Sequence, residues 1–75
     1  GQQLAQARPE SYESDLARAV YVLAVTLGAD GQTDDARVAA AEAVTRLTPL
    51  AAQRPQALGG LLEQAKLCQA VLDAA

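Results

Sequence analysis

Apolar residues in the first half of the chain recur with the period of an α-helix. Five of them lie three or four positions apart: Tyr12, Leu16, Val20, Leu23 and Leu27. Side chains at these intervals fall on one face of a helix, whereas a strand would alternate strictly. Pro9 is well tolerated in the first turn of a helix. The pattern therefore predicts a helix over residues 9–29 with the five side chains in the core.

A second stripe follows, and it is built mainly of alanine. Its members are Ala36, Ala40, Ala43, Leu47 and Leu50. The spacing again predicts a helix, here over residues 34–53. Alanine at a helix contact allows the neighbouring axis to approach toward the short end of the roughly 8–10 Å range. We therefore expect large side chains of the first helix to pack against small ones of the second.

The segment between the two stripes contains signals that end one helix and begin the next. Gly31 can take the left-handed conformation that terminates a helix. Thr33 can cap the second helix through its hydroxyl, and Asp34 and Asp35 stand where the helix dipole favours negative charge. These signals predict an antiparallel helical hairpin.

Prolines divide the remainder of the chain. Pro49 removes one backbone hydrogen bond inside the second predicted helix, so we expect a kink or an early end there. Pro55 opens a third predicted helix over residues 55–73. Its apolar stripe is Leu61, Ala65, Cys68 and Leu72. Residues 2–8 are typical of the tail of a preceding helix. The predicted fold is all-α, a hairpin plus a third helix.

The chain also repeats itself. The stretch from Leu4 to Pro9 matches the stretch from Leu50 to Pro55 at four of six positions, an offset of 46 residues. At the same offset, further identities follow: Leu16 with Leu62, Ala19 with Ala65, Ala24 with Ala70 and Val25 with Val71. The stripe of the third helix matches that of the first better at an offset of 45. A period of 20 to 50 residues is typical of stacked repeats.

Several of these residues stand at characteristic spacings: Leu23-Ala24, Leu27, Gly31, Ala36, Ala40 and Ala43. Over residues 4–54 the pattern resembles a tetratricopeptide repeat, and the long period resembles a bacterial subgroup with an extended second helix. The resemblance implies a right-handed helical repeat. Ala24 replaces the family's usual glycine, and the third helix matches loosely. A simple three-helix bundle is therefore the alternative fold.

The resemblance implies an interaction scaffold, in which the first helices of successive repeats line a groove for a peptide or a partner helix. Carried over by position, the groove would present Arg18, Tyr21, Val25, Glu63 and Lys66. The subgroup that grips a C-terminal carboxylate has asparagines where this chain has Tyr21 and Val22. A carboxylate clamp is therefore not expected.

Composition limits the size of the domain, the classes of partner and the cellular location. The 75 residues allow one domain or fragment over residues 1–75, which buries about 60% of the surface of its unfolded chain. The net charge of −3 argues against a nucleic-acid partner. No apolar run approaches the roughly 18–20 residues that span a bilayer. A single cysteine cannot form a disulfide within the chain, and we expect a cytoplasmic location.

No residue pattern predicts catalysis, a metal or a cofactor. The chain has no histidine, the commonest general base. Cys68 lies on the stripe of the third helix and is expected to be a small core residue. The three aspartates Asp30, Asp34 and Asp35 lack the spacing of a calcium loop and are expected to be structural. Tyr12 is expected in the core, whereas Tyr21 is either an exposed binding residue or a half-buried filler.

We therefore expect a non-catalytic scaffold that binds a protein or peptide partner. The alternative is a self-associating structural or docking bundle, because the third helix has no pairing helix and would offer apolar surface to a homo-oligomer. That surface would comprise Leu58, Leu61, Leu62, Leu67 and Leu72. A third hypothesis is a helical fragment of a larger regulator or enzyme.

Overall fold

The computed structural model describes residues 9–74, and these residues form three helices and no strand. Helix α1 spans Pro9–Ala29, α2 spans Thr33–Gln53 and α3 spans Pro55–Ala74. The predicted all-α hairpin with a third helix is confirmed. Residues 2–8, expected as the tail of a preceding helix, lie outside the described residues.

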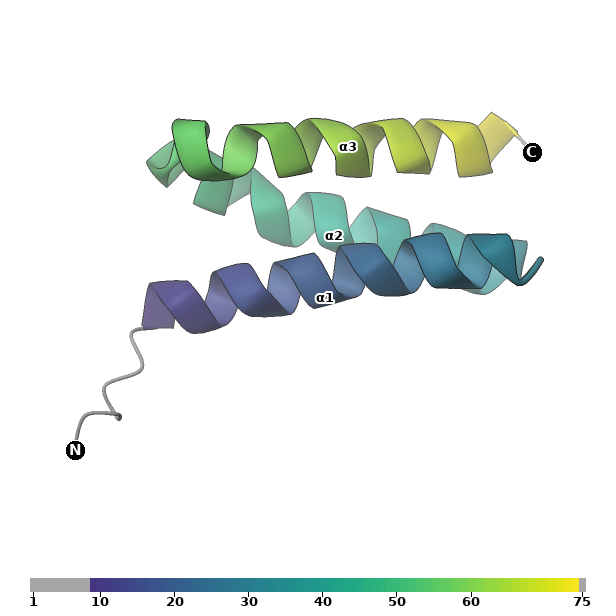
Figure 1. Ribbon diagram of the computed structural model, residues 1–75. Helices are drawn as coiled ribbons and strands as arrows, with labels where there is room; N and C mark the ends of the chain where they lie inside the picture. The colour runs from purple at the N-terminus through teal and green to yellow at the C-terminus, as the bar shows by residue number, and fades with distance from the viewer. Residues whose placement is uncertain (1–8, 75) are drawn as a thin grey trace.

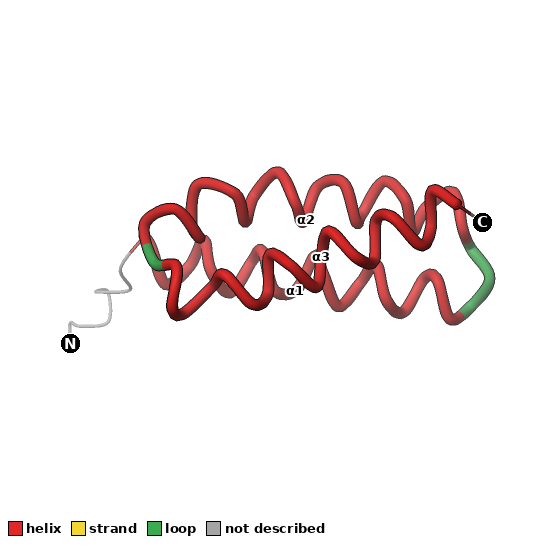
Figure 2. The backbone as a smooth tube through the Cα atoms, turned by 90° about the horizontal axis from the view of Figure 1, so that it is seen from above, coloured by secondary structure: helices red, strands yellow, loops and turns green. Residues whose placement is uncertain are grey.

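The three helices form two layers. Helices α1 and α3 run in the same direction and make one layer, and α2 runs in the opposite direction in the second layer (Figures 1 and 2). Helix α2 packs against both of the others along its length, whereas α1 and α3 touch each other little. Helix α2 therefore holds the assembly together.

The turn between α1 and α2 is built around Gly31, which has a φ of 81° as its predicted role requires. The amide of Gln32 donates to the carbonyl of Leu27 at 2.9 Å, and the amide of Gly31 donates to Gly28 at 3.1 Å. This pair of bonds satisfies carbonyl groups that the end of α1 would leave without donors. The turn thus reverses the chain with three residues outside the helices.

The expected cap at Thr33 is wrong. Helix α2 begins at Thr33 itself, and the preceding Gln32 is the cap residue, without a side-chain cap hydrogen bond. The reason is that the Gln32 carbonyl already accepts the first helical bond, from the amide of Ala36 at 2.9 Å. Asp34 and Asp35 lie in the first turn, as expected from the helix dipole.

Helix α2 does not end at Pro49. It continues to Gln53, and the amide of Arg54 donates to the carbonyl of Leu50 at 2.9 Å. Leu47 and Ala51 on either side of the proline are buried, so packing holds the helix through the lost backbone bond. One residue, Arg54, then separates α2 from α3.

The alanine stripe of α2 forms the centre of the core, as predicted. Ala36, Ala40, Ala43 and Leu47 are almost completely buried, and Leu50 is partly buried. Two apolar clusters surround this stripe. One joins Ala43 and Leu47 to Ala17 of α1 and Ala65 of α3, and the other joins Ala40 to Ala24 of α1.

The predicted contact face of α1 is partly wrong. Val20 and Leu27 pack against the core clusters as predicted, and Leu16 is partly buried. Tyr12 and Leu23 were expected in the core but are 63% and 50% exposed. The buried residues of α1 are instead Ala17 and Ala24. Small side chains on both helices permit the closest approach of α1 to the alanine stripe, and this contact outweighs the larger side chains that turn outward.

The third helix folds back on α2, so its apolar stripe is covered. Ala65 is buried, and the remaining members of the predicted stripe are partly buried: Leu61, Cys68 and Leu72. Leu58 is also buried, with 4% of its surface exposed. It was expected to offer free apolar surface, and this expectation is wrong because the side chain is buried when α3 packs on α2.

Candidate functional site

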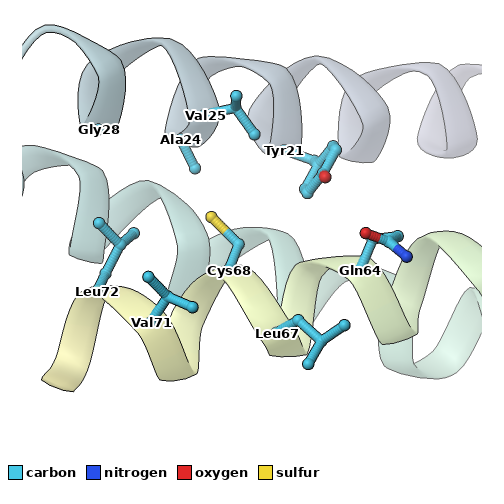
Figure 3. Close-up of a pocket in the computed structure, with 9 residues that line it drawn as sticks. All are labelled: Tyr21, Ala24, Val25, Gly28, Gln64, Leu67, Cys68, Val71 and Leu72. Carbon is cyan, nitrogen blue, oxygen red and sulfur yellow. The ribbon is translucent and has the colours of Figure 1, made fainter.

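A groove runs between α1 and α3 (Figure 3). It encloses about 370 Å³ and is open to solvent. Residues of α1 line one wall: Tyr21, Ala24, Val25 and Gly28. Residues of α3 line the other wall: Gln64, Leu67, Cys68, Val71 and Leu72. Successive lining residues lie one or three positions apart, so each helix contributes a continuous strip of its surface.

The floor of the groove is made of small or partly buried residues. Ala24 is fully buried, and Cys68 and Leu72 pack against the cluster around it. Leu72 lies beside Gly28 of α1, where an added Cβ atom would be 3.6 Å from Cδ2 of Leu72, an ordinary contact distance. The floor therefore follows from the packing of the two helices on α2.

The upper walls are apolar and exposed. Val25, Leu67 and Val71 are 47%, 59% and 67% exposed. Tyr21 is half-buried, since its side chain packs against the cluster that contains Ala17 and Leu47. Among the lining side chains, Tyr21 and Gln64 carry hydrogen-bonding groups, and both lie at the same end of the groove (Figure 3). This arrangement offers apolar contact along the groove and polar contact at one end.

The structure brings together two of the five residues that the resemblance placed in a groove. Tyr21 and Val25 line it, and Arg18 is exposed and lies outside the lining, one helical turn before Tyr21. Glu63 and Lys66 also lie outside the lining, and they form an exposed ion pair with 3.7 Å between Oε2 and Nζ.

The resemblance placed Glu63 and Lys66 of α3 in the groove, but other residues of α3 line that wall. The signal was available in the internal repeat, because the offset of 46 residues carries Tyr21 to Leu67 and Val25 to Val71. The same offset carries Arg18 to Gln64. Two pairs of equivalent positions therefore line the groove, Tyr21 with Leu67 and Val25 with Val71, whereas Arg18 lies outside the lining.

The five leucine positions expected to drive self-association differ in exposure. Leu67 is largely exposed and Leu58 is buried. The remaining three are partly buried: Leu61, Leu62 and Leu72. The apolar surface of α3 is therefore smaller than the sequence suggested, and Leu67 belongs to the groove.

A hydrogen bond between distant residues fixes the end of α3. Nε of Arg37 on α2 donates to the carbonyl oxygen of Leu72 at 3.0 Å in a partly buried position. The last carbonyl groups of a helix have no donors within the helix, so Arg37 supplies one. The same guanidinium lies 3.4 Å from Oδ1 of Asp34. This contact positions Leu72 in the floor of the groove.

Other features of the described residues suggest no chemistry. Residues 9–74 contain no group of three or more potential metal ligands. Asp34 and Asp35 lie at the surface in the first turn of α2. None of the three helices is long and apolar enough to cross a membrane. No protein-family model, characterised protein or solved structure matches this chain.

Proposed function

We propose that this protein is a non-catalytic interaction module that holds a peptide or helix of a protein partner in the groove between α1 and α3. The observation that carries the proposal is the exposure of Val25, Leu67 and Val71 along a groove whose floor is formed by buried and partly buried residues. The proposed architecture is a tetratricopeptide-like repeat, and the proposed location is the cytoplasm.

A helix with an apolar stripe is the occupant that fits best. The residues of α3 that line the groove from Leu67 to Leu72 are apolar, and an amphipathic helix presents apolar side chains at intervals of three and four. The volume of about 370 Å³ suits a few side chains. The contact is small, so we expect a weak and reversible complex.

The proposal can be tested with two matched valine variants. A photoreactive amino acid at Val25 first identifies the partner, which is then titrated against purified variants. We expect Val71→Asp to weaken binding about tenfold or more, because a charge would be desolvated in an apolar contact, at a cost above about 1.4 kcal/mol.

Val38→Asp is the control, because Val38 is 68% exposed on α2 and Val71 is 67% exposed on α3. Val38 does not line the groove, so its substitution should leave the affinity unchanged. Equal loss in both variants, or no loss in either, would exclude the groove as the binding site.

Self-association is the second candidate function, and the exposure of Leu67 and Val71 favours it. In that case a second copy would occupy the groove. Sedimentation over a range of protein concentrations separates the two functions. A dimer that the Val71→Asp substitution dissociates would support self-association, and a protein that is monomeric at every concentration would exclude it.

A further inference from the structure

Helices α1 and α3 are related by the internal repeat, yet they use different faces against α2. Helix α3 buries Leu58 and Ala65, and its Leu62 and Cys68 pack against the two core clusters that contain the alanine stripe of α2. The offset of 46 residues carries these positions back to Tyr12, Leu16, Ala19 and Val22. Helix α1 instead packs on α2 through Ala17 and Ala24. The face that α3 buries is thus turned outward on α1.

This outer face of α1, defined as Tyr12, Leu16, Ala19, Val22 and Leu23, is apolar; Leu16 is partly buried and the other four residues are exposed. Tyr12 is 63%, Val22 53% and Leu23 50% exposed. The residues lie three, four or one position apart and form a single strip along the helix. A contiguous apolar strip of this kind marks an interaction site.

The outer face of α3 has a different character. The positions of α3 that correspond to Ala17, Val20 and Leu27 of α1 are Glu63, Lys66 and Asp73. All three are charged and exposed. A charged face is stable in water. The outer face of α1 is therefore the one that would be stabilised by a further helix packed against it, and the outer face of α3 is not.

The connector before α1 indicates what covers its outer face. In the structure, Arg54 alone joins the end of α2 to Pro55 and thereby places α2 against α3. The sequence before α1 repeats this connector, with Arg8 and Pro9 in the same places and Leu4-Ala5 matching Leu50-Ala51. We propose that the outer face of α1 receives a helix of the α2 type, with an alanine stripe, joined to α1 through Arg8-Pro9 and antiparallel to it.

An extended chain tests this proposal. A second copy of residues 33–49 is placed directly before Leu4, so that it continues into residues 4–9 as the first copy continues into 50–55. The added segment contains no tyrosine. In a Tyr21→Phe background, quenching of tyrosine fluorescence by acrylamide therefore reports on Tyr12 alone. We expect quenching to fall several-fold on extension and the unfolding midpoint to rise.

The control is the same extension with glutamine at its three stripe positions, the copies of Ala36, Ala40 and Ala43. Glutamine keeps helix propensity but replaces the close apolar contact with polar groups. Protection of Tyr12 by the alanine extension alone supports the proposal. Equal protection by both extensions, or protection by neither, overturns it.

A second substitution locates the contact. Val22→Ser should leave the unfolding midpoint of the unextended chain unchanged, because the side chain is exposed there, and should remove most of the rise in the extended chain. If the unextended chain is instead a dimer that Val22→Ser dissociates, the outer face belongs to a second copy and the proposal fails. The effect of Val71→Asp on partner binding in the groove is independent of these results, so the two proposals can fail separately.

Discussion

At the scale of single residues, small side chains decide where the helices meet. Ala17, Ala24, Ala40, Ala43 and Ala65 are each at most 1% exposed, although alanine buries little surface itself. Their contribution is the short distance between helix axes, which lets larger neighbours such as Val20 and Leu27 pack at the edges of the contact. The core therefore tolerates added volume or charge poorly.

Ala40→Glu should abolish the hairpin or destabilise it by about 3 kcal/mol or more, because the carboxylate would enter a contact that is 1% exposed. Ala41→Glu is the matched control, since Ala41 is exposed on the same helix. Circular dichroism during thermal unfolding measures both. Similar midpoints for the two variants would contradict the assigned faces.

Glycine substitutions should have opposite signs at two places. Gly31→Ala should cost about 1–2 kcal/mol, because φ at Gly31 is +81° and a Cβ atom is strained there. Gly60→Ala should stabilise α3 by about 0.5–1 kcal/mol, because Gly60 lies inside a helix with nothing within 4 Å of an added Cβ. Denaturant unfolding of the two variants gives both values, and a common sign would contradict the turn geometry.

At the scale of elements, α2 determines the arrangement because both other helices pack on it. Its buried residues occupy a wide band that serves α1 and α3 together. Arg37 adds a polar contact near its start, where the guanidinium meets the carbonyl of Leu72. The end of α3 is thus held by a side chain of α2 as well as by apolar packing.

Arg37→Ala should destabilise the protein by about 1 kcal/mol, since a partly buried carbonyl loses a charged donor. The amides in the last turn of α3 should exchange with solvent faster. Arg46→Ala is the comparison, because Arg46 makes an i,i+4 ion pair with Glu42 at the surface, worth about 0.3–0.5 kcal/mol. Faster exchange at the end of α3 in the Arg46 variant would contradict the assignment.

At the scale of the whole molecule, the two-layer arrangement creates the groove. Helices α1 and α3 both lie against α2 and touch each other little (Figure 1). A groove lined by both helices therefore remains open between them. Cys68, the single cysteine of the chain, lies in the floor of this groove and is partly buried. Its thiol therefore reports on occupancy.

Alkylation of Cys68 should slow when a partner helix occupies the groove, because the occupant covers the floor. The rate of reaction with a soluble thiol reagent, measured with and without the identified partner, checks this. Val71→Asp should restore the faster rate at the same partner concentration. A rate unchanged by saturating partner would place the binding site elsewhere.

The sequence by itself determined the helices, the turn and the alanine contact face of α2. Helical periodicity, prolines and Gly31 are local signals, and the alanine stripe is flanked by polar residues that leave only one face to bury. The sequence of helix α1 does not indicate which face is buried, because residues 19–25 are an uninterrupted apolar run and several faces could have been buried.

Only the tertiary structure decided which side of α1 faces inward. Tyr12 turned out exposed and Tyr21 half-buried, since the closest approach to the alanines of α2 selects Ala17 and Ala24. The lining of the groove depends on that rotation and on the position of α3. The position of α3 follows from the single residue between α2 and α3 and from the packing of α3 on α2. Which side of a helix faces inward is decided by its contacts with other helices, so it cannot be read from any single stretch of the chain.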